Sequence, residues 1–224
     1  MMLRTWGGIL VGALDIEANL DHYSRDREPE SRYASFDYCF NYFQTAREQG
    51  KLDCLVSGES LQLSCLHLGF YLASWGMFRG SSTLLQHSVR RFIPVVTELV
   101  SAPAELWTMD ADQYSEDAIQ MIMSFRGQLG GTLPGRASDT LVTKVMLGTM
   151  GCVPAFDTSF RKGFAVWTFG VKSLRKVGQF YEDNIDVIES HRKQTLDFDT
   201  ELPTTRRYTR AKVIDMIFVV QGAR

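Results

Sequence analysis

The sequence places one aspartate where a carboxylate could stabilise positive charge. Asp157 follows Pro154 and opens a helix that we expect over residues 157–168. A carboxylate at a helix start accepts backbone N–H groups and faces the positive end of the helix dipole, which favours its ionised form. Such a carboxylate can stabilise a developing cation and can orient or deprotonate a water molecule. The alternative is that Asp157 is only a helix cap.

A turn before this aspartate could bind an anion. Gly135 lies in the stretch Leu133-Pro-Gly-Arg-Ala-Ser138, and glycine adopts backbone shapes that other residues resist. Ser138 or Asp139 can cap the helix that follows. Arg136 is a candidate for direct contact with a phosphate. The alternative is an ordinary connection between two helices.

The turn, the helix after it and the aspartate together resemble the core of the helix-hairpin-helix DNA glycosylases. The similarity is clearest over residues 133–161 and rests on the pattern Lys144…Gly148…Pro154-x-x-Asp157-Thr158-x-x-Arg161. The resemblance implies that the hairpin amides hold a DNA phosphate near a helix N-terminus. It also implies that Asp157 is the catalytic carboxylate of base excision. The hairpin has one glycine where the family usually has two, which weakens the phosphate prediction.

The same resemblance predicts a monofunctional enzyme. Bifunctional members carry a nucleophilic lysine near the end of the hairpin, but the corresponding residues Ala137-Ser-Asp-Thr140 include none. Water would therefore displace the base and leave an abasic site. Lys144 is expected to be structural or to face a phosphate. The predicted DNA contacts are Gly135, Arg136, Ser138, Lys144, Arg161, Arg79 and Ser81.

Base excision also needs a wedge and a pocket for the extruded nucleotide. The resemblance places the wedge in the loop 75–82, where Met77 or Phe78 would fill the gap in the base stack. Trp75 would stack on the flipped base, with core packing as the alternative. Asn19, after an apolar run near the N-terminus, is a further candidate for the base pocket. A solvated loop is the alternative there.

Charge is unevenly distributed along the 224 residues, which carry a net charge of −2. Residues 1–157 contain 12 basic and 18 acidic residues, a net charge of −6, whereas residues 158–224 contain 12 and 8, a net charge of +4. A basic C-terminal third could provide a phosphate-binding face, unless the asymmetry is chance. A hydrophobic content of 45% is typical of a folded globular protein.

Neither a metal nor a cofactor is predicted. The cysteines Cys39, Cys54, Cys65 and Cys152 lack close-pair spacing and resemble free thiols of a reducing compartment. Because no cysteine follows Cys152, the iron–sulfur cluster of some family members is not expected. The apolar run Trp6–Leu14 is too short to span a membrane and is no convincing signal peptide. Cytoplasm is the expected compartment.

The expected fold is mostly α-helical and, from the resemblance, two-lobed with the active site in the cleft between lobes. One lobe would span 60–165 and hold the hairpin motif 133–161, and residues 1–59 and 166–224 would form the other. A helix over 208–221 is favoured over a strand at Val213–Val220. A polar loop is expected over 192–206. The other expected helices are 34–49, where a strand is the alternative, 59–78, 83–101, 114–129 and 171–191.

The sequence thus predicts a monomeric DNA glycosylase with double-stranded DNA as its partner. The resemblance points to a divergent branch, suspected of excising glucosylated or hydroxymethylated cytosine from phage DNA as antiviral defence. Repair of ordinary damaged bases is the alternative substrate range. Two other classes stay open: a helix-hairpin-helix module that binds DNA without chemistry, and a helical protein–protein interaction domain.

Overall fold

The chain is mostly helical. A computed structural model describes residues 14–25, 27–80, 82–135 and 137–224. Within these ranges it has ten α-helices, five short 3-10 helices and one two-stranded antiparallel sheet. None of the described helices has the length and hydropathy needed to cross a membrane. The predictions made for Arg136, for Ser81 and for most of the run Trp6–Leu14 fall outside the described residues.

The elements alternate long helices with short turns. The α-helices and strands are α1 (Ile16–Arg25), α2 (Ala34–Glu48), α3 (Gly58–Ser74), α4 (Ile93–Val100), α5 (Glu116–Thr132), α6 (Asp139–Thr149), α7 (Thr158–Phe164), α8 (Val171–Asp183), α9 (Ile185–Ser190), β1 (Gln194–Leu196), β2 (Pro203–Arg207) and α10 (Arg210–Ala223).

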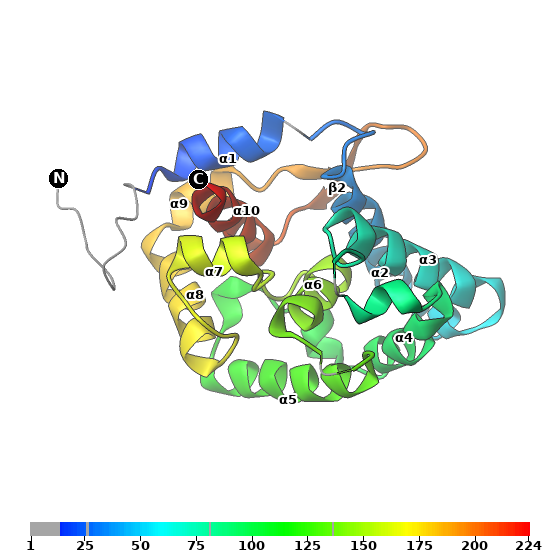
Figure 1. The fold of residues 1–224 in the computed structure, drawn as a ribbon. Helices are drawn as coiled ribbons and strands as arrows, with labels where there is room; N and C mark the ends of the chain where they lie inside the picture. Colours follow the sequence, from blue (N-terminus) through cyan, green and yellow to red (C-terminus); the bar gives the residue numbers. More distant parts are fainter. Residues whose placement is uncertain (1–13, 26, 81, 136) are drawn as a thin grey trace.

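Two helices are almost entirely buried and form the centre of the molecule. Every residue of α6 from Leu141 to Thr149 is buried, and Figure 1 shows this helix enclosed by the others. Eleven residues of α10 are buried as well. Because both helices are apolar nearly all round, they bury most of their surface rather than one stripe. The charged residues that they carry therefore lie inside the protein.

Glycines bring α7 and α10 into backbone contact. A Cβ atom on Gly222 of α10 would overlap the carbonyl oxygen of Ser159, and one on Gly163 of α7 would overlap that of Phe218. The two helices pack this closely only because both positions lack a side chain. The close approach fixes the start of α7, and hence Asp157, against α10 (Figure 1).

The structure confirms several expected helices and shortens others. Helices at 34–49, 114–129 and 208–221 are present as α2, α5 and α10, so the strand alternative at Val213–Val220 is wrong. The helix expected over 157–168 ends at Phe164, where Ala165 takes a left-handed φ of 53°. The single helix expected over 171–191 is interrupted at Asn184, which has φ −137° and ψ 29°.

The helix expected over 83–101 is wrong in its first half. Residues Thr83–Gln86 and Val89–Phe92 form 3-10 helices, and α4 begins only at Ile93. Pro94 lies in the first turn of α4. Proline has no backbone N–H to donate and clashes with the carbonyl four residues earlier, so it favours a helix start at that point.

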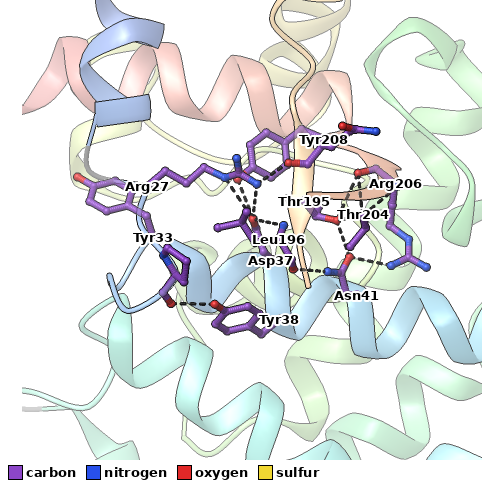
Figure 2. Close-up of polar contacts among 12 residues, drawn as sticks. Arg27, Tyr33, Asp37, Tyr38, Asn41, Thr195, Leu196, Thr204, Arg206 and Tyr208 are labelled. Atoms are coloured by element: carbon purple, nitrogen blue, oxygen red, sulfur yellow. Dashed lines mark hydrogen bonds and ion pairs between the residues drawn. The ribbon is translucent and has the colours of Figure 1, made fainter. Parts of the chain in front are cut away.

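The polar loop expected over 192–206 is instead a β-hairpin anchored to α2. Asp37 of α2 accepts hydrogen bonds from the backbone N–H of Leu196 at 2.8 Å and from the hydroxyl of Tyr208 at 2.7 Å. It also pairs with Arg27 at 2.6 Å. Figure 2 shows Asn41, one turn further along α2, bonded to Thr195 of β1. These partners come from far along the chain, which is why the local sequence did not indicate strands.

Candidate functional site

A partly buried ion pair joins Lys144 and Asp157. Oδ1 of Asp157 accepts the backbone N–H of Phe160 at 2.9 Å and so caps α7, as predicted. Its Oδ2 atom accepts a hydrogen bond from Nζ of Lys144 at 3.0 Å. The Lys144 side chain is 5% exposed and that of Asp157 is 21% exposed. The carboxylate therefore has the open edge of the pair, and the ammonium lies behind it.

The backbone leading into Asp157 is held on both sides by side chains. Phe156 donates its N–H to Thr143 at 2.8 Å and accepts a hydrogen bond from Thr140 at 3.1 Å, both in α6. Ala155 donates its N–H to Oδ1 of Asp215, in α10, at 3.1 Å. Because these three backbone groups are already hydrogen-bonded, the segment before α7 cannot shift without breaking such a bond.

A second charge pair lies beside the first. Nζ of Lys212 contacts Oδ2 of Asp215 at 3.0 Å and the hydroxyl of Tyr23 at 2.9 Å. The Lys212 side chain is 2% exposed and that of Asp215 is 4% exposed. Burial raises the pKa of Asp215, and the neighbouring Asp157 adds to this, whereas Lys212 and Lys144 act in the opposite direction. The two pairs are thus electrostatically coupled.

Trp75 lies over both ammonium groups. Nζ of Lys144 and Nζ of Lys212 are each 5.3 Å from the centre of its ring system. The ring of Tyr23 is nearly parallel to it, with centroids 6.4 Å apart. Lys212 is also 4.8 Å from the ring of Tyr23 and 4.6 Å from that of Phe36. Cation–π attraction accounts for this arrangement.

These side chains enclose a small cavity. Its volume of about 10 Å³ leaves room for roughly one water molecule. In this conformation a nucleobase does not fit, so binding one requires a lining side chain to move. The lining residues are Tyr71, Trp75, Lys144, Leu147, Ala155, Asp157, Lys212, Asp215 and Val219.

Two tyrosines at the site keep their protons at neutral pH. Burial raises the pKa values of Tyr71 and Tyr23 well above their usual value, and the negative charge of Asp215 raises both further. Tyr71 is held in place by close packing, because a Cβ atom on Gly148 of α6 would overlap its ring. The cavity therefore combines two carboxylates, two ammonium groups and neutral phenols. Once a lining side chain moves, the cavity could place a polar aromatic ligand beside charges of both signs.

The hairpin has the turn shape that the sequence predicted. Gly135 has φ +68°, in the left-handed region that favours glycine, and is exposed. The Ser138 hydroxyl accepts the N–H of Leu141 at 3.2 Å and caps α6. Arg161 donates to the carbonyl oxygens of Asp157 at 3.4 Å and Trp167 at 3.1 Å. Contacts of these residues with DNA stay predictions.

Lys144 is not placed as a surface phosphate contact would be. Its ammonium is directed to Asp157 and to the face of Trp75. The reason is that α6 is buried all round, so a lysine on it reaches a carboxylate inside the protein instead of solvent. This makes Lys144 part of the candidate site itself.

The residues of the loop 75–82, which was predicted to hold the wedge, differ in how deeply they are buried. Met77 and Phe78 are half-buried and pack against the core, with the Phe78 ring 6.2 Å from that of Phe92. Arg79 is exposed, and its guanidinium lies over Gly76, while Ser81 is outside the described residues. Of the loop side chains proposed for wedge or pocket, Trp75 lines the cavity. The wedge role of Met77 or Phe78 stays a prediction.

Asn19 does not line this cavity. It is fully buried between α1 and α10, where its amide donates to the carbonyl of Ile217 at 3.3 Å and to Gln221 at 3.0 Å. The expectation of a solvated loop is wrong as well, since Asn19 lies within α1. Its amide joins two helices and does not face the charged groups.

Four polar residues of the site were not predicted from the sequence: Tyr23, Tyr71, Lys212 and Asp215. A signal was present in α10, where Lys212 and Asp215 lie three residues apart within an apolar segment. A charged pair at that spacing inside a buried helix is rare unless its members pair with each other or with a ligand. In the described part of the chain, no three His, Cys, Asp or Glu side chains gather to hold a metal ion.

Comparisons with known proteins identify no relative of this chain. No protein-family model matches the chain, no curated protein matches it, and no solved structure matches it.

Proposed function

We propose that this chain is a monofunctional DNA glycosylase of the helix-hairpin-helix type. The observation that supports this most strongly is the position of Asp157, whose carboxylate is fixed by the cap of α7 and by Lys144 and keeps one edge open to an aromatic-lined cavity. That arrangement matches the needs of glycosidic hydrolysis, which builds positive charge on the deoxyribose. The two-lobed cleft and the placement of DNA across it are part of this proposal.

The proposed reaction starts when the C1′–N bond breaks and its electron pair goes to the base. The carboxylate of Asp157 stabilises the sugar cation that forms, and a water molecule adds its oxygen to C1′. Asp157 takes a proton from this water, and the base leaves, so that an abasic site remains. Lys144 positions the carboxylate. Because its ammonium is engaged by this carboxylate, Lys144 does not attack C1′ in the proposed mechanism.

The proposed substrate is a modified base in double-stranded DNA, with glucosylated or hydroxymethylated cytosine of phage DNA as the first class and ordinary damaged bases as the alternative. Backbone contacts would come from the hairpin at Gly135 and Ser138 and from the basic C-terminal third of the chain. An antiviral role in the cytoplasm belongs to the same proposal.

A second candidate is a DNA-binding module that does no chemistry. One specific observation favours it: the cavity of about 10 Å³ does not admit a base without movement of a lining side chain. Such a module would bind DNA in a salt-sensitive manner and form no abasic product.

An abasic-site assay separates the two candidates. The protein is incubated with duplexes containing uracil, alkylated or oxidised bases, and with phage DNA containing hydroxymethylated or glucosylated cytosine, and alkali then cleaves abasic sites. Asp157→Asn keeps an oxygen for the helix cap but loses the carboxylate, and we expect about 10²- to 10⁴-fold less product. Ser115→Asn, at the cap of α5, is the matched control.

The outcomes discriminate clearly. Cuts by the wild type and by Ser115→Asn, with little product from Asp157→Asn, would support the glycosylase. Full activity of Asp157→Asn would remove Asp157 from the mechanism. Binding to duplex DNA without cuts on any substrate would favour the non-catalytic module.

A further inference from the structure

The cavity has two cations, although the mechanism above uses only one. Lys144 serves Asp157, whereas Lys212 has its own carboxylate, Asp215, and faces the same aromatic ring. We propose that Lys212 receives the negative charge of the departing base, so that the site takes bases that leave as anions and rejects bases that are already cationic. This inference rests on the proposed glycosylase activity.

The burial of Lys212 argues for an electrostatic role. Removing an ion pair from water is costly, and apolar residues of similar size often stabilise a helix interface as well or better. Most of the other buried residues of α10 are apolar, yet Lys212 and Asp215 lie among them beside the cavity. Packing alone gives no reason for a charged pair at this position.

Three of the aromatic rings at the site already face an ammonium group. The rings of Tyr23, Phe36 and Trp75 surround the ammonium of Lys212 at 4.8, 4.6 and 5.3 Å. A base with a positive charge, such as 7-methylguanine, would meet the ammonium groups of Lys212 and Lys144 instead of free aromatic faces. Asp157 and Asp215 also line the cavity, but their attraction for a cationic base is offset because each is paired with one of these ammonium groups, whose repulsion we expect to select against such bases.

The indole of Trp75 occupies the space that the base would take in this proposal. Trp75 follows the last residue of α3, and Gly76 after it has φ +77°, so this side chain sits at a chain reversal rather than within a helix. Its Nε1 atom is buried and has no hydrogen-bond partner among the described residues. A buried N–H without a hydrogen-bond partner is unfavourable, which favours displacement of the indole by a ligand. A base in the same position would face both ammonium groups.

The charge balance of the step is simple. The electron pair of the C1′–N bond moves onto the ring nitrogen of the base and spreads to its carbonyl oxygens. Lys212 stabilises this anion as an ammonium, and the base takes a proton from the ammonium or from solvent on release. The more basic the leaving anion, the more the reaction depends on Lys212.

Leaving-group dependence tests the proposal. Excision rates are compared within two pairs of duplex substrates. The first pair contains uracil or 5-fluorouracil, and the second contains 5-hydroxymethylcytosine or 5-formylcytosine. In each pair the base named second is the better leaving group. A duplex with 7-methylguanine is the cationic probe. Lys212→Met removes the ammonium, and Lys212→Met with Asp215→Asn keeps the interior neutral if the single variant does not fold. Lys176→Met is the control, because Lys176 also lies over a ring, that of Phe164 at 4.5 Å, but does not line the cavity.

We expect the variants to lose about 100-fold on the poorer leaving group of a pair and about tenfold or less on the better one. Equal losses on both members would overturn the leaving-group role and indicate a structural one. Excision of 7-methylguanine by the wild type would overturn the selection against cations while leaving the glycosylase proposal intact. Absence of abasic product from every duplex would instead remove the glycosylase proposal, and this inference with it.

Discussion

The ammonium of Lys144 lies 3.0 Å from Oδ2 of Asp157, and it is the carboxylate that keeps the open edge. The two residues are 13 positions apart, one inside α6 and the other at the cap of α7. A carboxylate in front of a buried ammonium can reach a substrate while its partner stabilises its charge. In the glycosylase that we propose, Asp157 would be the group that touches the sugar and Lys144 the group that positions it.

We predict that Lys144 forms no covalent bond with DNA. Its ion pair favours the ammonium, which cannot attack C1′, so incubation with substrate and sodium borohydride should give no trapped protein–DNA complex. Abasic sites should be cut only after alkali is added. A trapped complex that disappears in Lys144→Met would contradict this prediction and assign Lys144 as an amine nucleophile.

We predict that a single methyl group at the contact of α7 and α10 destabilises the protein. In Gly222→Ala the new Cβ overlaps the carbonyl oxygen of Ser159, so the helices must separate, at a cost of about 1–3 kcal/mol. Gly127→Ala is the control, because Gly127 lies in α5 with no atom within 4 Å of an added Cβ. There alanine should stabilise by about 0.5–1 kcal/mol.

Denaturant unfolding of both glycine variants measures the difference. Since α7 begins at the cap formed by Asp157, Gly222→Ala should also lower the activity if the glycosylase proposal holds. Equal stability of the two variants would show that the close contact is not required.

We predict that Asp37 is essential for the β-hairpin. In Asp37→Ala, Arg27 and the N–H of Leu196 lose their buried acceptor (Figure 2), which should cost about 3–5 kcal/mol. Asp37→Asn should cost less because its amide oxygen still accepts a hydrogen bond. Asp186→Ala, at an exposed position of α9, is the control. Hydrogen exchange at residues 194–207 should rise in Asp37→Ala, and unchanged exchange would argue against this anchoring role.

We predict that one thiol of the folded protein reacts with alkylating reagents. Cys54 is exposed, whereas Cys39, Cys65 and Cys152 are buried. Burial raises the pKa of Cys152 to about 12, and that of Cys39 is raised further, so both stay protonated as the pH rises from 7 to 9. Mass spectrometry should find one modified cysteine before unfolding and four after it. Rapid labelling of Cys152 in the folded state would indicate that the interior opens.

The sequence predicted those features of the structure that depend on residues close together along the chain. The apolar patterns of α2, α5 and α10 predicted helices at their observed places, and Gly135, Ser138 and Asp157 have the turn and cap geometries expected of them. Because the residues that form these features lie within a few positions of each other, the local sequence is enough to predict them. The late start of α4 was missed although Pro94 is a local signal for it, whereas the break at Asn184 was missed because the residues on both sides are compatible with a helix.

Only the tertiary structure decided which side chains meet at the cavity. Asp215 lies three residues from Lys212 and Tyr23 lies 189 residues from it, yet the polar atoms of both are within hydrogen-bonding distance of the Lys212 ammonium. The contact of α7 with α10, made possible by Gly163 and Gly222, brings them to Asp157. The local sequence was enough to predict that the carboxylate of Asp157 caps a helix. Its partners depend on long-range packing, which no local pattern encodes.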